Sequence, residues 1–437
     1  MKAGRFLPAA FLLFGGLTIF RMVLAQDGGE NGVLPPDQES VIHYMRSDDL
    51  ADPITELKKK VEAGRVTLTH DATTGYLKSV LKELGVLSAT QCLVFSKTSA
   101  QTSLISPKTP RAIYFSDDTY VAYVQGSDHL ELSAVDPQKG AVFYELGQDP
   151  NGPPKIRRAE KCMRCHIGPK TFQVPGYLVR SSLTMADGTA RSQITEFVSG
   201  HNSPLNQRWA GWYVTGKSAH DSHLGNSFLQ DPLHPEAFDP KPGTDVMNLA
   251  DRFDTTKYLR PTSDIVALML LDDSVRMHDL LVYARYETLF AERDRAQGDF
   301  PPDWPEKRIS RAGEVLLSYL LFRDETPLKG KLEGTSGIEK EFPLRGPRDR
   351  KGRSLRDFDL TTRMFKYPCN YLIYSKEFDA LPDPMKQYLW KRLAEILGGK
   401  DQSPTYRSMS RADQARVREI LLDTKPEFSA WCQKNNQ

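Results

Sequence analysis

The amino-acid sequence predicts an α+β fold in which an antiparallel, β-rich part is followed by a mainly α-helical C-terminal part. Between residues 112 and 146, short segments rich in aromatic and β-branched residues alternate with turn formers, as in a β-meander. After residue 264, apolar residues recur at helical spacing over several long segments. The chain has 437 residues, of which 39% are hydrophobic and 26% charged, so we expect more than one structural unit.

Four consecutive strands are expected in the β-rich part, because turn-forming residues separate four apolar runs. The runs lie at residues 112–115, 120–124, 130–135 and 141–146. Further extended segments are expected at residues 177–183, 193–198 and 209–214. Together these segments predict a β-rich module at residues 91–255.

Helices are expected on both sides of this module. Residues 26–40 are polar and rich in proline and glycine, which predicts a flexible leader within the segment 26–90. Two short helices should follow it, near residues 53–63 and 74–84. The C-terminal region, residues 256–437, is expected to form helices at 264–293, 306–322, 384–397 and 411–422. Asp383 and Ser410 are typical residues at the start of the last two.

The first 25 residues have the pattern of a secretory signal peptide. Lys2 and Arg5 precede an apolar run at residues 6–20, and a cleavage site is expected after Ala25. The run is shorter than the roughly 20 residues that span a bilayer, although an uncleaved anchor is an alternative. The sequence therefore predicts a periplasmic or otherwise exported bacterial protein without an integral membrane domain after cleavage. The formal charge of +2 falls to about −1 without the signal, which gives no indication of nucleic-acid binding.

The most informative motif is CMRCH at residues 162–166. Two cysteines separated by two residues and followed by histidine are the attachment pattern of c-type haem. Cys162 and Cys165 would each form a thioether with a vinyl group, and His166 would be an axial iron ligand. Half of a zinc site or a redox dithiol is the alternative, but the sequence has no second CxxC to complete a zinc site. The motif therefore predicts one covalent haem c per chain.

The sixth iron ligand is the open question for function, because it separates electron transfer from ligand chemistry. His223 lies in a glycine-bounded loop that could fold back over the haem, so we expect His166 and His223 to be the iron ligands. The other candidates are His201, His220, His278, Met185 and no protein ligand at all. His278 follows the apolar spacing of its helix, which favours a buried structural histidine.

Two other sets of residues are relevant to an exported haem protein. Cys92, Cys369 and Cys432 remain after haem attachment, and any two of them could form a disulfide outside the cytoplasm. Basic residues also surround the motif, where they could contact the haem propionates or steer an acidic redox partner. They are Lys155, Arg157, Arg158, Lys161, Arg164 and Lys170.

The motif at 162–166 is that of the c-type cytochromes, and other segments extend the resemblance over residues 112–375. They are YFSDDTYVAYV at 114–124, GHNSPL at 200–205, RWAGWYVTG at 208–216 and YPCNYLIYS at 367–375. With the motif, they resemble large, single-haem, exported bacterial proteins with a cytochrome c domain. That resemblance implies haem c, iron and export, carried by Cys162, Cys165 and His166, but no established reaction.

Three functions follow as expectations. The first is one-electron transfer with a redox partner protein. The alternatives are a haem enzyme, resembling a peroxidase or oxidase, and a redox or gas sensor, both of which need an open iron position. In an enzyme, His201 or His223 could supply the acid or base.

Overall fold

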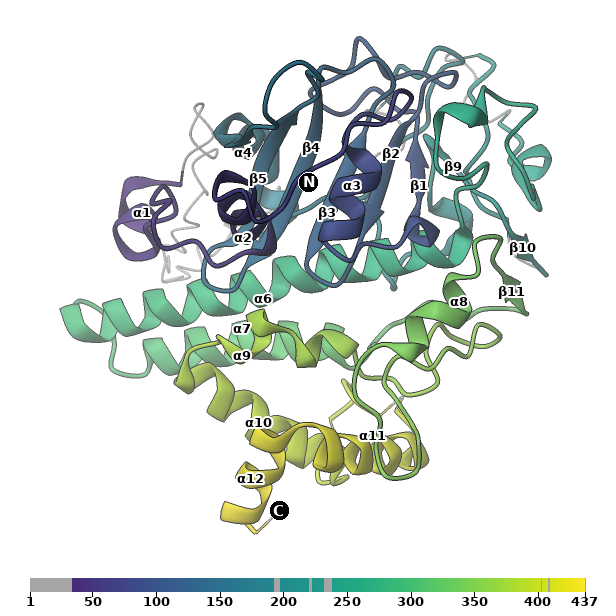
Figure 1. The fold of residues 1–437 in the computed structure, drawn as a ribbon. Helices are drawn as coiled ribbons and strands as arrows, with labels where there is room; N and C mark the ends of the chain where they lie inside the picture. The colour runs from purple at the N-terminus through teal and green to yellow at the C-terminus, as the bar shows by residue number, and fades with distance from the viewer. Residues whose placement is uncertain are drawn as a thin grey trace, which may run out of the picture.

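A seven-stranded antiparallel sheet forms the upper part of the molecule (Figure 1). The computed structural model describes residues 34–191, 197–219, 222–231, 238–401, 403–407 and 409–436. The sheet order is β6-β5-β4-β3-β2-β1-β9. Its strands are β1 (Cys92–Val94), β2 (Arg111–Phe115), β3 (Thr119–Tyr123), β4 (His129–Asp136), β5 (Gly140–Gly147), β6 (Ile156–Arg158) and β9 (Trp212–Tyr213).

The predicted four-strand meander is confirmed as β2 to β5, and its turns explain the register. Between β4 and β5, the Asp136 carboxylate accepts hydrogen bonds from the backbone N–H groups of Gln138 and Lys139. Gly140 then has a φ of +82°, a conformation that favours glycine. This turn pairs Asp136 with Gly140 and sets the alignment of the two longest strands.

Both faces of the sheet are buried, and successive residues of a strand face opposite sides. Tyr114 points into a core that it shares with α2 (Pro53–Glu62) and α3 (Leu77–Glu83). Its neighbour Phe115 points into a second core, which it shares with α6 (Ile265–Gln297). The sheet is therefore the middle layer of the upper part, with α2 and α3 on one face (Figure 1).

Helix α6 lies between the sheet and the remaining C-terminal helices (Figure 1). It has 33 residues, which corresponds to a length of about 50 Å. Its N-cap, Asp264, accepts hydrogen bonds from two backbone N–H groups of the first turn. The four predicted helices are confirmed, and a short one follows them. Below α6 lie α7 (Trp304–Leu320), α9 (Lys376–Asp379), α10 (Asp383–Leu397), α11 (Arg411–Thr424) and α12 (Pro426–Lys434).

Shorter elements connect these layers. Helix α4 (Met163–His166) contains most of the CMRCH motif and follows the edge strand β6. Each extended segment expected after it contains a strand of two residues, at 180–181, 197–198 and 212–213. Residues 193–196 lie outside the described residues. The remaining elements are α1 (Pro36–Ile42), β7 (Arg180–Ser181), β8 (Phe197–Val198), β10 (Lys217–Ser218), β11 (Leu332–Glu333) and α8 (Ile338–Glu341).

The predicted segments 26–90, 91–255 and 256–437 do not correspond to separate cores. The core beneath the sheet contains residues from Leu34 to Cys432. The opposite core joins Leu50, before the sheet, to Tyr258, after it. The physical reason is that the sheet buries both faces, and segments from either end of the chain cover them.

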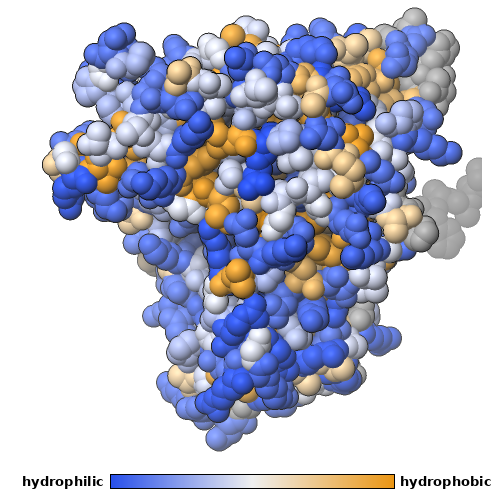
Figure 2. All heavy atoms as spheres, turned by 45° about the vertical axis from the view of Figure 1, so that its right-hand side comes forward, coloured by the Kyte–Doolittle hydropathy of each residue, from blue (hydrophilic) through white to orange (hydrophobic). Residues whose placement is uncertain are grey.

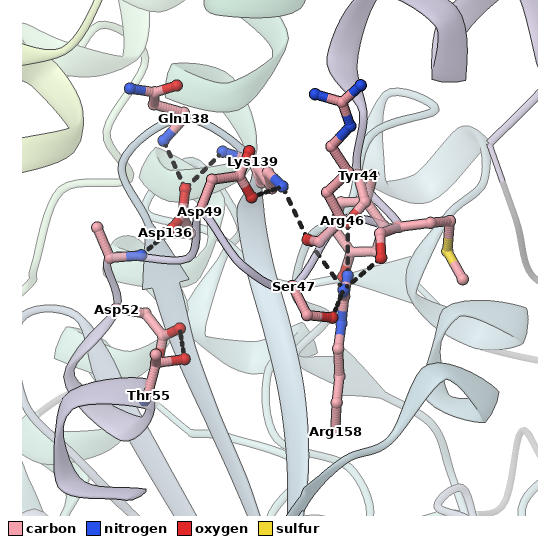
Figure 3. A network of polar contacts seen from close by, with 12 residues as sticks. Tyr44, Arg46, Ser47, Asp49, Asp52, Thr55, Asp136, Gln138, Lys139 and Arg158 are labelled. Atoms are coloured by element: carbon pink, nitrogen blue, oxygen red, sulfur yellow. Dashed lines mark hydrogen bonds and ion pairs between the residues drawn. The ribbon is translucent and has the colours of Figure 1, made fainter. Parts of the chain in front are cut away.

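The N-terminal segment is ordered where the described chain begins, which differs from the expected flexible leader for residues 34–40. Leu34 is buried, and helix α1 follows it. In Figure 3, the side chains of Lys139 and Arg158 point toward the backbone of residues 44–47, which follow α1. Lys139 Nζ donates to the Arg46 carbonyl and pairs with Asp49. The Arg158 guanidinium donates to the Tyr44 carbonyl at 2.6 Å and to three further acceptors in residues 45–47.

Replacing Arg158 with alanine should loosen this segment. The substitution removes a charged donor from four acceptors, and we expect the free energy of unfolding to fall by about 2 kcal/mol. Proteolysis near Ser47 should also accelerate. Arg157→Ala, at an exposed position on the same strand, is the control and should change neither measurement. Equal effects of the two variants in denaturant titrations would contradict the assignment.

The described helices do not include one that is both long and apolar enough to cross a membrane. Helix α6 is long enough, but it carries Asp272, Asp273 and Asp279 and is buried against protein on most sides. Figure 2 shows hydrophilic residues over most of one face, with hydrophobic patches mainly in its upper part. The predicted signal peptide, residues 1–25, lies outside the described residues.

Candidate functional site

The three chemically active residues of the motif lie on one helical turn beside the edge of the sheet (Figure 1). A short 3₁₀ turn ends at Cys162 and continues into α4, so Cys162, Cys165 and His166 have the i, i+3, i+4 spacing that places side chains on one face. Cys162 is half-buried and Cys165 is exposed. Met163 points away into the core, where its sulfur lies 3.1 Å from the Tyr44 hydroxyl. The motif is therefore anchored by Met163 while its two thiols stay accessible.

The imidazole of His166 is held in one orientation and one tautomer. Its Nδ1 lies 2.8 Å from the carbonyl oxygen of Gly176, which can only accept, so Nδ1 carries the proton. The backbone bonds in return, with Gly176 N–H donating to the His166 carbonyl at 3.0 Å. Burial lowers the pKa of His166 to about 4, so the ring is neutral near pH 7. Nε2 is then an unprotonated donor atom, the form that a metal ligand requires.

A cavity of about 300 Å³ opens beside these residues, over the sheet face that looks toward α6. Cys162, Cys165 and His166 line one side of it, and Leu271 and Val275 of α6 line another. The cavity is lined by strand residues that lie opposite one another in the sheet, among them Ile113, Ala122, Glu131, Ser133, Phe143 and Glu145. The motif therefore lies at a preformed cavity of the size range that binds small molecules and cofactors.

The cavity wall is mixed, with apolar rings beside a charged pair. Phe143 packs against the His166 ring, with the ring centroids 4.5 Å apart. Arg111 and Glu131 form an ion pair, and Gln101 donates to the other Glu131 oxygen at 2.9 Å. Burial by itself raises the pKa of Glu131, but Arg111 and Gln101 hold it below the ordinary value. Glu131 is thus ionised at neutral pH inside the cavity.

Some polar atoms at this pair have no partner within the described part of the chain. Arg111 Nε and Gln101 Oε1 are buried without a hydrogen bond. Such groups cost free energy unless a ligand or water satisfies them. Arg111 and Glu131 line the cavity, whereas Gln101 supports the pair from outside the lining.

Sequence reasoning missed Arg111, Glu131 and Gly176. The strands do carry a signal, because Arg111, Glu131 and Glu145 alternate with buried apolar residues and so share a face with Phe143. A charged stripe on a sheet face that also faces a helix indicates a cavity between them. No comparable local signal points to Gly176.

None of the four described candidates for a second ligand lines the cavity. His278 is bonded at both ring nitrogens, to Glu377 at 2.7 Å and to the Asp117 carbonyl at 2.9 Å. A buried structural histidine, with both ring nitrogens hydrogen-bonded, is what the apolar spacing of its helix predicted. His220, the fifth candidate, lies outside the described residues.

His201 and Met185 also contact residues away from the cavity. His201 Nδ1 lies 3.0 Å from Asp273, and its ring stacks on Tyr319 at a centroid distance of 3.8 Å. Met185 belongs to a turn closed with Thr189 and packs in a small separate cluster that includes Leu229.

The expectation that His223 shares an iron site with His166 is not supported by this arrangement. His223 is buried, and its ring meets the edge or face of Trp209 at a centroid distance of 5.8 Å. Its Nδ1 has no hydrogen-bond partner within the described ranges. The loop that carries His223 folds back on β9 instead, where Leu224 N–H donates to the Arg208 carbonyl and Asn226 N–H to the Trp212 carbonyl.

The buried His223 should make stability depend on pH. Burial lowers its pKa to about 4 from the ordinary 6.5, so the unfolded chain binds a proton that the folded chain excludes. The stabilising contribution is complete above about pH 6.5 and declines as the pH falls toward 4, by about 3 kcal/mol in total. His223→Gln, which does not titrate, should remove this component from urea unfolding measured at several pH values. An unchanged pH dependence in the variant would contradict a buried, neutral His223.

The three cysteines outside the motif are buried, whereas most of the basic residues near the motif are exposed. Cys92, Cys369 and Cys432 are buried and free, so the structure contains no disulfide among them. Lys161 pairs with Glu145 at the cavity, and Arg158 binds the N-terminal segment. The other basic residues near the motif are exposed: Lys155, Arg157, Arg164 and Lys170.

Comparison of the chain with protein-family models, with curated proteins and with solved structures finds no match.

Proposed function

We propose that this protein is an exported c-type cytochrome that holds one haem c and exchanges single electrons with a redox partner protein outside the cytoplasm. One observation carries the proposal. The Nδ1 of His166 is bonded to the Gly176 carbonyl, which leaves a neutral Nε2 beside a cavity that both motif thiols also line. A metal-bound histidine typically has its second nitrogen engaged in this way.

The residues present suit haem. Cys162 and Cys165 would hold it through thioether bonds, and His166 would bind iron through Nε2. When bound, the iron supplies one-electron oxidation and reduction. Phe143 and Val275 supply apolar wall for the porphyrin, and the guanidinium of Arg111, which also lines the cavity, suits a carboxylate such as a propionate.

Access for a partner is available on the thiol side. Cys165 is exposed and also lines the cavity, so a group bonded to its sulfur extends from the interior to the surface. Exposed Arg157, Arg164 and Lys170 give this side positive charge. Such a surface favours an acidic partner and a rate of association that falls with ionic strength.

A haem enzyme or gas sensor is the second candidate, and one observation favours it. Within the described ranges, His166 is the only histidine among the residues lining the cavity, and no methionine lines it. An iron position without a protein ligand could bind a small molecule. The Arg111–Glu131 pair then offers charged groups inside the cavity, in place of the distant His201 and His223.

Two spectra test these proposals. The chain, produced with its N-terminal segment in a bacterium that attaches haem c, should contain one covalent haem per chain in the pyridine haemochrome assay. The reduced protein is then exposed to carbon monoxide. An unchanged spectrum supports electron transfer through a six-coordinate iron, and ready binding supports the enzyme or sensor. A protein without covalent haem would overturn both.

A further inference from the structure

The peptide unit between Gly176 and Tyr177 is hydrogen-bonded on both sides. Its carbonyl accepts from His166 Nδ1 at 2.8 Å. Its N–H donates to Asp279 Oδ1, also at 2.8 Å. One planar peptide therefore connects the imidazole of the motif to a carboxyl group on α6, which lies 113 residues later in the chain.

Packing holds this connection in place. Asp279 and Gly176 are buried, and a Cβ atom on Gly176 would lie 2.2 Å from Asp279 Oδ1. Only a residue without a side chain allows the backbone to approach the carboxyl so closely. The peptide cannot tilt toward α6, and the hydrogen bond from Tyr177 prevents it from tilting away.

Only one oxygen of the Asp279 carboxyl is hydrogen-bonded to the described residues. Its second oxygen, Oδ2, is buried and makes no hydrogen bond to the described residues. Burial raises its pKa well above the ordinary value. What the side chain supplies is therefore a hydrogen-bond acceptor for Tyr177 N–H, and asparagine offers the same acceptor.

We propose that Asp279 is a positioning residue for His166, which acts through the Gly176–Tyr177 peptide to fix the ring and to strengthen donation from Nε2. An acceptor on the N–H side polarises the peptide and makes its carbonyl a stronger acceptor for Nδ1–H. A stronger bond at Nδ1 makes Nε2 more basic, and such outer partners tune a bound metal. This inference rests on the proposed function, in which Nε2 binds haem iron.

The test compares Asp279→Leu with Asp279→Asn in the haem-loaded protein. The leucine variant leaves Tyr177 N–H without an acceptor, and we expect a roughly tenfold shift of the Fe(III)/Fe(II) equilibrium toward Fe(II). For a one-electron couple, this raises the reduction potential by about 59 mV. The asparagine variant keeps the acceptor and should have the wild-type potential. Redox titration followed by absorption measures both.

Asp273→Leu is the matched control. It also removes a buried acceptor from α6, but its partners are His201 and Asn370, which do not line the cavity. We expect it to lower stability without moving the potential. Equal potentials in wild type and Asp279→Leu, or equal shifts in Asp279→Leu and Asp279→Asn, would overturn the role of the acceptor. A wild-type protein without covalent haem would instead overturn the proposed function, and this inference with it.

Discussion

Replacing both Cys162 and Cys165 with serine is expected to abolish covalent haem attachment completely. The two thiols are the only cysteines that line the cavity in the described structure, and a serine hydroxyl forms no thioether. The haem stain of a denaturing gel should be lost, together with the haemochrome spectrum of the precipitated protein. Each single variant should retain at most one thioether, which shifts the haemochrome band away from that of the wild type.

A matched control is available because three further cysteines lie elsewhere. Cys432→Ser, on α12, removes a buried thiol far along the chain from the motif and should leave haem content unchanged. A double variant at 162 and 165 that still carries covalent haem would contradict both the site and the proposed function. A zinc or dithiol role would show as wild-type protein without haem and with measurable metal or disulfide.

Gly176→Ala is expected to have the largest effect of any single methyl group near the site. The new Cβ would lie 2.2 Å from Asp279 Oδ1 and 3.1 Å from Thr171 Cβ, and both neighbours are buried. Overpacking of this kind costs about 3 kcal/mol. The shift of the backbone also displaces the carbonyl that holds His166. We therefore expect a lower free energy of unfolding together with a lower yield of haem-loaded protein.

Gly147→Ala serves as the control for this prediction. A Cβ at Gly147, at the end of β5, meets no atom within 4 Å. Denaturant unfolding of that variant should match the wild type to within about 0.5 kcal/mol. Similar losses in the two variants would show that the close contact at Gly176 is relieved easily, which contradicts the rigid peptide described above.

The elements that were predicted correctly have local causes. The β4–β5 hairpin follows from Asp136 and Gly140, which lie within a few residues of one another. Ser410 caps α11 by accepting from Asp413 N–H, as the capping pattern predicts. Helix α12 was not predicted; it begins at Pro426, and only Lys425 separates it from α11.

Only the part of the site that the motif itself contains could be predicted from the sequence. Residues 162–166 are adjacent in the chain, so their shared helical turn follows from helix geometry. The partner of His166, its link to Asp279 and the position of His223 depend on contacts across long sequence separations, which periodicity does not reveal. The sequence does not single out Asp279, because Asp272 and Asp273 are also buried acids of the same helix.

The order of the chain has a consequence for maturation. Most of the sheet wall and the motif lie within residues 92–166, whereas Leu271 and Val275 of α6, which line the opposite side of the cavity, follow about 100 residues later. Contacts over such separations form late in folding, because loop closure precedes them. On the proposed function, we therefore expect an interval during export in which both thiols and His166 are assembled beside the sheet while α6 has not yet docked. We expect attachment of the proposed haem to be easiest in that interval, before α6 docks and encloses the group.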